Sequence, residues 1–176
     1  AKQLLTDGAS VDARDRLGNM PLAIAARHGH VEIVKLLLEF KAPVNARNLE
    51  ASTALFLAAE DERRASAAVL LAAGADPNIP GRSGLAPLSA AAYTGNTELV
   101  TLLLAKGADP KSLDATGKTA IVYAAGRGFA PVVKLLLDEC AAAGVEVRTN
   151  CTIERVEHAD DGSFRLHTTQ GRHAAA

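Results

Sequence analysis

A spacing of 33 residues organises most of this sequence. Pairs of adjacent alanines begin at positions 25, 58, 91 and 124, and a leucine or isoleucine stands three residues before each pair. Leucine pairs follow at positions 36, 70, 102 and 135, so one copy is shifted by a single residue. Because several residue types keep one period over four copies, the chain is a tandem repeat. A unit of this length cannot bury its apolar face alone and does so by stacking on its neighbours.

Each copy has the same internal pattern. In the first copy, a polar segment containing Gly18 leads to a short predicted helix over Pro21–Arg27. A glycine turn then leads to a second predicted helix over Val31–Glu39, whose apolar residues fall on one face. We expect the paired alanines where one helix touches the next, because their small side chains let two helices approach closely.

Residues suited to helix starts stand at equivalent positions in different copies. Pro21 and Pro87 suit the first helical turn, where a missing N–H group is no loss. Thr53 and Thr119 can cap the corresponding helices of the second and fourth copies. The sequence therefore predicts an all-α fold built from helix–turn–helix–loop units.

These residues resemble a known repeat family. The run GNMPLAIAARHGHVEIVKLL, from Gly18 to Leu37, closely resembles the ankyrin repeat, and GADPN, from Gly74 to Asn78, resembles its loop. The resemblance implies an L-shaped solenoid whose loops project as hairpin-like fingers. It also implies a concave surface, formed by the fingers and the inner helices, that binds other proteins. It divides residues 1–140 into a partial repeat, 1–14, and four repeats, 15–47, 48–80, 81–113 and 114–140. Residues 141–176 then form a C-terminal appendage.

The resemblance also implies which residues contact a partner. In ankyrin repeats these are the finger residues around each glycine and the two residues after the paired alanines. In this sequence the first and fourth copies supply basic residues there, the second acidic residues and the third the most apolar ones. The candidate partner-binding residues are Arg16, Leu17, Asn19, Arg27, His28, Glu50, Ser52, Glu60, Asp61, Arg82, Leu85, Tyr93, Thr94, Leu113, Lys118 and Arg127.

Tyr93 is the most individual of these candidates. It is one of only two tyrosines, and it stands at an inner-helix position that packing does not require. We expect it to form an apolar centre with Leu85 and Leu113, flanked by Arg27 and Arg127. A partner would then present an apolar side chain to Tyr93, acidic groups to the two arginines and a basic group to the acidic residues of the second copy.

The second copy departs from the others at two places. It has Glu62 where the other three copies have glycine. If that turn needs a positive φ, a glutamate there costs about 1 kcal/mol. It also has Ser66 and Ala67 where the other copies have isoleucine, leucine or valine. We therefore predict that the second repeat is the least stable of the internal ones.

The period breaks after the fourth copy. Cys140-Ala141-Ala142-Ala143-Gly144 replaces the expected glycine loop, and strand-like runs follow at 145–150, 152–158 and 163–168. An isolated hairpin is marginal in water. We expect residues 145–176 to be mobile or lightly docked on the last repeat through Val145, Val147 and Phe164.

This tail carries a second resemblance. Residues 138–173 resemble an internal segment of FAD-dependent oxidoreductases of the two-dinucleotide-binding type. The glycine-rich turn and the Ala-Thr-Gly segment that hold flavin in that family are missing from this sequence, so no cofactor site is transferred. We interpret the tail as a gene fusion or a sequence-assembly junction.

Side chains able to do chemistry form no catalytic pattern. His28 and His30 could suggest a metal pair; the structural alternative is that His30 follows a glycine turn and bonds the backbone while His28 points outward. Gly81–Gly84 belongs to a finger, because no Lys-Ser/Thr helix start follows it. Cys140 and Cys151 have no histidine near them in sequence. We predict a chain that is not an enzyme and has no cofactor or metal.

Composition bears on the remaining classes of partner. The 19 basic and 20 acidic side chains give a net charge of −1, whereas a nucleic-acid binder carries a basic excess. No apolar run approaches the ~18 residues of a membrane span. Two cysteines make no disulfide framework, so we expect a reducing, cytoplasmic location. The chain opens without Met and closes on three alanines, so we expect a fragment of a larger protein, monomeric on its own.

Two other functions remain open on the sequence alone. The repeats could be an insertion in, or a fusion to, a flavoprotein of which a non-functional fragment is present. They could also be an inert spacer that holds flanking domains apart. The fold defines a surface and leaves the ligand undetermined, so the partner's identity does not follow from the repeats.

Overall fold

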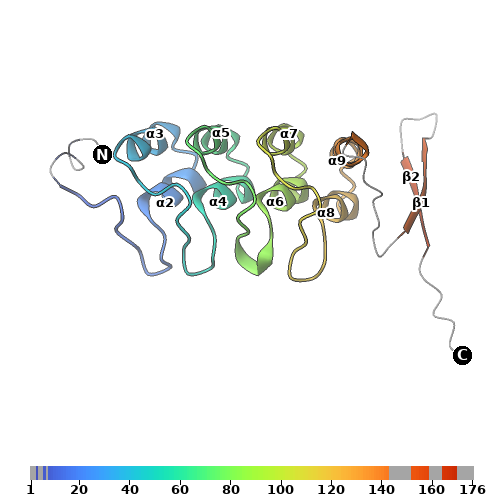
Figure 1. Ribbon diagram of the computed structural model, residues 1–176, viewed down its shortest axis with the longest axis horizontal. Coiled ribbons are helices and arrows are strands. Elements are labelled where there is room, and N and C mark those ends of the chain that lie inside the picture. Colours follow the sequence, from blue (N-terminus) through green and yellow to red (C-terminus); the bar gives the residue numbers. More distant parts are fainter. Residues whose placement is uncertain (1–2, 4–5, 7, 143–151, 159–163, 170–176) are drawn as a thin grey trace, which may run out of the picture.

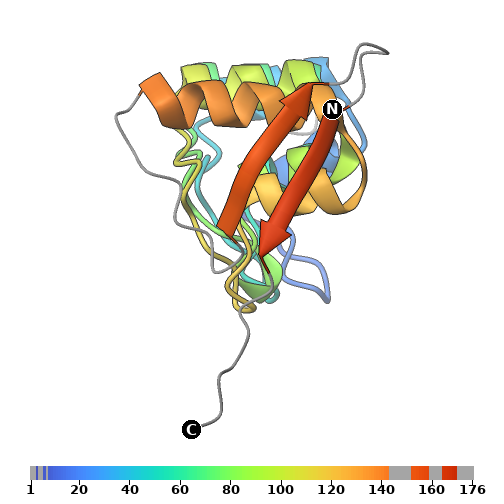
Figure 2. The same ribbon diagram turned by 90° about the vertical axis from the view of Figure 1, so that its right-hand side faces the viewer.

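The computed structural model of this chain describes residues 3, 6, 8–142, 152–158 and 164–169. Within them, eight α-helices form two rows, with α2, α4, α6 and α8 in one row and α3, α5, α7 and α9 in the other (Figure 1). The loops project beyond the first row, and when the stack is viewed from its end the helices of each row lie one behind another (Figure 2). The helices are α2 (Pro21–Arg27), α3 (Val31–Glu39), α4 (Ala54–Glu60), α5 (Arg64–Ala72), α6 (Pro87–Thr94), α7 (Thr97–Ala105), α8 (Ala120–Gly126) and α9 (Ala130–Ala142).

The helix starts follow the sequence pattern with one exception. The helices α2 and α3 have the predicted bounds, and Pro21 and Pro87 lie in the first turns of their helices. The Thr53 side chain accepts a hydrogen bond from the Phe56 N–H at 3.2 Å, so the predicted cap is confirmed. The cap predicted for Thr119 is wrong, because its buried hydroxyl makes no hydrogen bond within the described part of the chain.

The paired alanines lie where consecutive inner helices meet. Ala26, Ala59 and Ala92 are fully buried, and α2 packs against α4, α4 against α6 and α6 against α8. Because alanine extends little beyond the backbone, these helices can pack closely while the leucines of the outer helices fill the space between the two rows. The stack is therefore one continuous core shared by all four repeats.

The turn between the two helices of each repeat adopts a left-handed conformation. Gly29, Gly95 and Gly128 have φ between 74° and 77°. Glu62, at the same position in the second repeat, has φ 59°, which confirms that a glutamate stands where the backbone favours glycine. Each turn thus has one geometry, imposed on the second repeat by the stack around it.

Hydrogen bonds tie each finger to the next. Asn45 and Asn78 each accept, through the side-chain oxygen, the backbone N–H of the residue 31 positions later. Arg14 and Arg47 each donate to the carbonyl oxygen 33 positions later. These bonds hold the fingers at the spacing set by the helices, so that the finger tips form a row.

Two strands follow the helices in the chain. β1 (Thr152–His158) and β2 (Phe164–Thr169) pair in antiparallel fashion, with Val156 opposite Leu166. The second and third predicted strands therefore form a hairpin. The first predicted strand, at 145–150, and the side chains expected to dock the tail lie outside what the structure describes.

Candidate functional site

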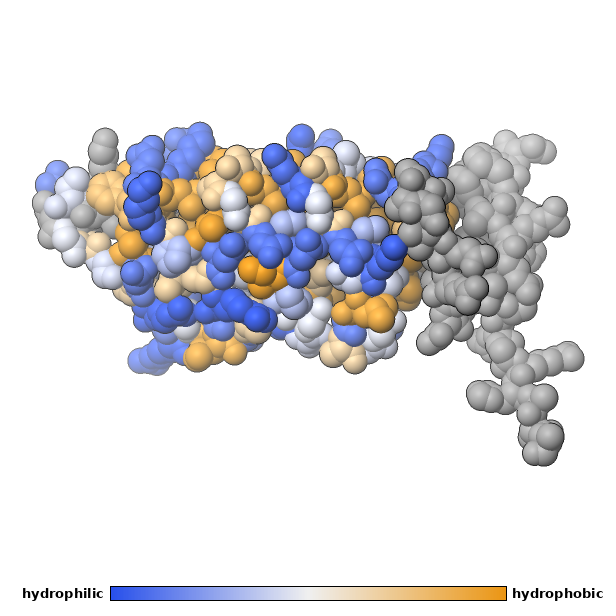
Figure 3. Space-filling view, in the orientation of Figure 1, coloured by the Kyte–Doolittle hydropathy of each residue, from blue (hydrophilic) through white to orange (hydrophobic). Residues whose placement is uncertain are grey.

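The residues that follow the paired alanines lie at the ends of the inner helices. Arg27, Glu60 and Tyr93 are equivalent positions of successive repeats, at the ends of α2, α4 and near the end of α6. On the face of the molecule in Figure 3, hydrophilic residues form a band along the stack, interspersed with smaller apolar areas. The inner-helix ends of the first two repeats are charged, whereas the third offers an aromatic ring.

Charges of the first two repeats are paired within the chain. Arg27 Nε lies 3.0 Å from Asp61 Oδ2, across the boundary between the first and second repeats. Arg82 Nη2 makes a close ion pair with Glu60 Oε1, from the third finger to the end of α4. The chain itself therefore supplies the basic groups that we expected from a partner at Glu60 and Asp61.

The third and fourth repeats meet in an aromatic and cationic cluster. Tyr93 is 45% exposed, and the guanidinium carbon of Arg127 lies 4.5 Å from its ring centroid. The ring of Tyr123 contacts the ring of Tyr93 edge to face, with centroids 6.0 Å apart and an interplanar angle of 80°. We call Tyr93, Tyr123 and Arg127 the Tyr93 cluster. Such ring pairs and cation–π contacts are attractive and restrain the side chains that make them.

Asp114 anchors this cluster from the finger of the fourth repeat. Tyr123 donates its hydroxyl hydrogen to Asp114 Oδ2. Burial acts to raise the pKa of Asp114, but hydrogen bonds from Tyr123, from Thr116 and from the Lys118 N–H outweigh it and lower the pKa to about 2. The same hydrogen bond to Asp114, together with burial, raises the pKa of Tyr123. Asp114 is therefore ionised near neutral pH, and Tyr123 is held in one orientation.

Sequence reasoning found Tyr93 and Arg127 and missed Tyr123 and Asp114. A signal for Tyr123 was present, since the equivalent positions in the earlier repeats hold isoleucine, leucine and alanine. Tyr93 was interpreted as a ring that packing does not need, with Leu85 and Leu113 as its apolar neighbours. In the structure it packs on two side chains of the next repeat.

The apolar candidates separate into exposed and half-buried residues. Leu17 and Leu113 are exposed on their fingers, as is Leu49, whose backbone N–H donates to the Leu17 carbonyl at 3.0 Å. Leu85 is half-buried and packs against the core. Leu85 therefore belongs partly to the fold, whereas Leu113 is free to contact another molecule.

Two candidates are buried, and for them the surface prediction is wrong. Asn19 is 8% exposed and bonds two neighbours, donating to Asp15 Oδ2 at 3.0 Å and accepting from Asn48 Nδ2 at 2.8 Å. Ser52 is 1% exposed, and its hydroxyl oxygen accepts the Arg82 N–H at 3.3 Å. Both residues hold the bases of fingers through these hydrogen bonds. A polar side chain is needed for this structural role as well as for partner binding, so the residue type alone does not distinguish the two.

The other candidates lie at the surface or partly so. Arg16, His28, Glu50, Arg82 and Lys118 are exposed, and Thr94 is half-buried with its hydroxyl donating to the Ala91 carbonyl. Lys118 Nζ lies 5.8 Å from the ring centroid of Tyr123. Lys118 thus lies beside the Tyr93 cluster, while Arg16 and Glu50 lie on the first two fingers.

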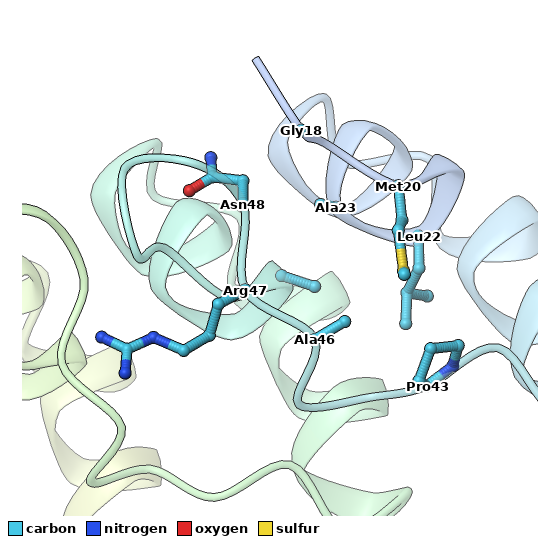
Figure 4. A pocket seen from close by; sticks show the side chains of 9 residues that line it. Gly18, Met20, Leu22, Ala23, Pro43, Ala46, Arg47 and Asn48 are labelled. Carbon is cyan, nitrogen blue, oxygen red and sulfur yellow. The ribbon is translucent and has the colours of Figure 1, made fainter. Parts of the chain in front are cut away.

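A pocket lies between the first two fingers and the start of α2 (Figure 4). Its lining includes Met20 and Leu22, and its two longest polar side chains are already engaged. Arg47 donates to the carbonyls of Ala51 and Pro80, and Asn48 donates to Asn19. This pocket therefore presents apolar surface and backbone without a set of reactive groups.

His28 and His30 do not form part of a metal site among the described residues. Their ring centroids are 6.0 Å apart, and no group of three His, Cys, Asp or Glu side chains within the described ranges could hold a metal ion. Both histidines are exposed, and the backbone hydrogen bond expected from the His30 side chain is not made to any described residue. In the same part of the chain, every helix is too short or too polar to cross a bilayer.

Comparison with protein families gives a match over most of the chain. A family model described as ankyrin repeats (3 copies) matches residues 1–81 and 80–151. The matched residues include the helices α2 to α9, their fingers and every member of the Tyr93 cluster. A comparison with curated proteins gives no match.

Proposed function

This chain belongs to the ankyrin-repeat family, whose members generally act as protein-interaction modules, and we propose that it binds a partner protein through its fingers and inner-helix ends. The proposal makes the chain a scaffold without catalytic activity, cofactor or metal. It acts as a monomeric cytoplasmic module, and nucleic acids and membranes are not its partners. The near-zero net charge supports the exclusion of nucleic acid.

The observation that carries this proposal is the exposure of Tyr93. Together with tryptophan, tyrosine and arginine are the residues enriched among those that dominate binding energy at interfaces. Tyr93 is 45% exposed and is held by Tyr123 and Arg127, so it offers a large surface with little loss of side-chain entropy on binding. A rigid, half-exposed ring of this kind is more useful for binding than for folding.

The proposed contact surface extends from this ring along the stack. Leu113 adds exposed apolar area on the neighbouring finger, and the ion pair between Arg27 and Asp61 lies toward the other end. Exposed ion pairs add little to affinity and serve orientation and specificity. The proposed contacts, beside the Tyr93 cluster, are Arg16, Leu17, Arg27, His28, Glu50, Glu60, Asp61, Arg82, Leu85, Thr94, Leu113 and Lys118.

Affinity capture with matched variants tests the proposal. The purified chain, Tyr93→Ala and Lys134→Gln are immobilised and exposed to the same cell extract. We expect a protein that the unmodified chain and Lys134→Gln recover but Tyr93→Ala does not. That protein is purified, and the Kd of its complex with the chain is measured. Lys134 is an exposed cation of α9, away from the inner helices, and serves as the control. Recovery of the same proteins by all three baits contradicts the proposal and favours an inert spacer.

The flavoprotein alternative is tested by absorbance. A chain that carries flavin shows the visible absorption bands of that cofactor after purification, whereas a binding module is colourless. Reconstitution with added FAD followed by gel filtration extends the test to a cofactor lost during purification. Flavin that co-elutes with the chain would contradict the proposed function as a non-enzymatic module.

A further inference from the structure

The two halves of the inner-helix surface differ in how their charges are satisfied. In the first half, the charged residues that follow the alanine pairs are joined in ion pairs: Arg27 pairs with Asp61, and Glu60 pairs with Arg82. In the second half, Arg127 and Lys118 lie over the rings of Tyr93 and Tyr123, at 4.5 and 5.8 Å from the centroids. No ion pair joins either cation to an acidic side chain within the described residues.

Comparison of equivalent positions in the repeats explains why Arg127 has no carboxylate partner among the described residues. Arg27 and Asp61 stand at the same positions, two repeats earlier, as Tyr93 and Arg127. The contact recurs, but an aromatic ring has replaced the cation, and the arginine has replaced the carboxylate. A guanidinium over a ring face still presents its planar set of N–H donors, which fits the two oxygens of a carboxylate.

Asp114 is the acidic side chain of this region and does not fill that role. Its carboxylate already accepts hydrogen bonds from the hydroxyls of Tyr123 and Thr116 and from two backbone N–H groups. Together, the side chains of Lys118, Arg127 and Asp114 carry two positive charges and one negative. A singly charged carboxylate therefore balances their net charge, whereas a doubly charged phosphate exceeds it.

Gly126 leaves open the space beside the cluster. It stands where the other repeats have Arg27, Glu60 and Tyr93, and it follows Tyr123 by three residues on the same face of α8. Its φ lies outside the left-handed region, and a Cβ there would meet nothing within 4 Å. Glycine is less favourable than alanine in a helix, so neither backbone geometry nor packing accounts for it here.

We propose, on the basis of the protein-binding function above, that the Tyr93 cluster and Gly126 bind an acidic segment of the partner protein. An apolar side chain of that segment lies over Gly126 against the two tyrosine rings, and a neighbouring Asp or Glu carboxylate pairs with Arg127. The absent side chain at Gly126 admits the apolar group, and the Arg127 guanidinium, held over the Tyr93 ring, pairs with the carboxylate. Charge complementarity therefore selects an acidic partner at this end of the stack.

Selection from a displayed library of random peptides tests this inference on the full chain. We expect the enriched peptides to carry an Asp or Glu next to a leucine, isoleucine or aromatic residue. The most enriched peptide is then synthesised with its acidic residue and with the corresponding amide, and binding is measured by fluorescence anisotropy. Replacing the carboxylate by the amide should weaken binding about tenfold.

Protein variants separate the parts of the proposal. Arg127→Gln should weaken binding of the acidic peptide about tenfold and should not further weaken binding of the amide peptide, because both changes remove one pairing. Gly126→Leu should weaken binding of both peptides, whereas Gly126→Ala, which adds only a Cβ, should bind normally. Lys134→Gln, which removes an equal charge on α9, should leave binding unchanged. Thermal unfolding of each variant shows that it remains folded.

The outcomes distinguish this inference from the proposed function. Peptides that bind the chain without an acidic residue, additive effects of Arg127→Gln and the amide peptide, or full binding by Gly126→Leu would each overturn the inference and leave protein binding intact. Enrichment of no peptide above an unrelated control protein would count against the proposed function and the inference together.

Discussion

A Cβ placed on Gly81 would lie 2.4 Å from the ring of Phe56, so the two residues share one space. Phe56 is fully buried in α4, where the first and third repeats have the smaller Ala23 and Ser89. Gly81 stands where the other fingers have aspartate or asparagine, whose side chains accept backbone N–H groups of their own finger. The third finger lacks that acceptor and instead begins with a short 3₁₀ turn, Arg82–Gly84.

This pairing predicts a coupled effect on stability. Gly81→Ala should lower the free energy of unfolding by about 1–3 kcal/mol, because the added methyl group overlaps the ring and the φ of Gly81 would itself accept any residue. In a Phe56→Ala background the same change should have little effect. Urea unfolding of the four proteins gives the coupling energy. Equal losses in both backgrounds would contradict the assignment.

The second repeat offers a route to a more stable protein. Glu62→Gly should raise the free energy of unfolding by a few tenths to about 1 kcal/mol, because Glu62 has φ 59°. Ser66 is fully buried with its hydroxyl unpaired among the described residues, so Ser66→Ala should also stabilise by removing an unsatisfied polar group. Lys41→Gly, at another left-handed position with φ 62°, is the matched control for the turn effect.

Amide exchange tests the same prediction without mutation. Because solenoid stability is a sum of repeat and interface terms, the weakest repeat opens most often. Residues 60–72 should therefore exchange faster than residues 93–104. Equal protection of the two segments would show that Glu62 and Ser66 do not make the second repeat weak.

The fold was predictable from the sequence because the residues that define each helix and turn recur from copy to copy. The bounds of α2 and α3 follow from glycine, proline and alanine positions that recur in each copy, so one ambiguous copy is corrected by the others. The second repeat shows the strength of this effect: Glu62 adopts the turn geometry of its glycine equivalents. The Thr119 cap failed because a residue type permits a hydrogen bond without requiring the side-chain orientation that makes it.

The candidate site was predictable only in part, because it depends on what differs between copies. Tyr93 could be identified as unusual in its own repeat. Its packing on Tyr123 and Arg127 depends on how two neighbouring repeats meet, and the sequence does not specify those side-chain orientations. The pairing of Arg27 with Asp61 has the same origin, so charges interpreted as free for a partner are satisfied between repeats.

The exposure of Val122 in the last repeat predicts how much the tail contributes to stability. Val122 is 40% exposed, whereas Phe56 and Ser89, at the same position in the two preceding repeats, are buried. A cap packed on the end of the stack would bury this position. Deleting residues 150–176 should therefore leave the thermal unfolding of the repeats nearly unchanged. A fall in Tm of many degrees on deletion would show that the tail acts as a C-terminal cap.

Tyr93 should matter more for binding than for folding. Tyr93→Ala should weaken binding of the partner by about 2 kcal/mol, as expected for an aromatic anchor. Its contacts with Tyr123 and Arg127 are partly exposed, so the loss of unfolding free energy should stay below about 1 kcal/mol. Isothermal titration and urea unfolding measure the two effects on one sample. A variant that binds normally, or one that unfolds, would rule out this role.

Asp114 predicts how stability changes in acid. Its folded-state pKa of about 2 lies below the ordinary value of 3.8, because hydrogen bonds from Tyr123, Thr116 and the Lys118 N–H outweigh the effect of burial. The ionised carboxylate therefore stabilises the folded state above pH 3.8, and this contribution is lost as the pH falls from 3.8 toward 2. Asp114→Asn removes the titrating group and keeps a side chain of the same shape.

The difference between the two proteins isolates this carboxylate. As the pH falls from about 5 to about 2.5, the unfolding free energy of the unmodified chain should decrease more steeply than that of Asp114→Asn. Tyr123→Phe, which removes the hydroxyl donor to Asp114, should give an intermediate slope, since Thr116 and the backbone N–H groups still hold the carboxylate. Urea unfolding at a series of pH values measures the three slopes. Parallel curves for all three proteins would mean that Asp114 has the same pKa in the folded and unfolded chain, and that its hydrogen bonds do not stabilise the Tyr93 cluster.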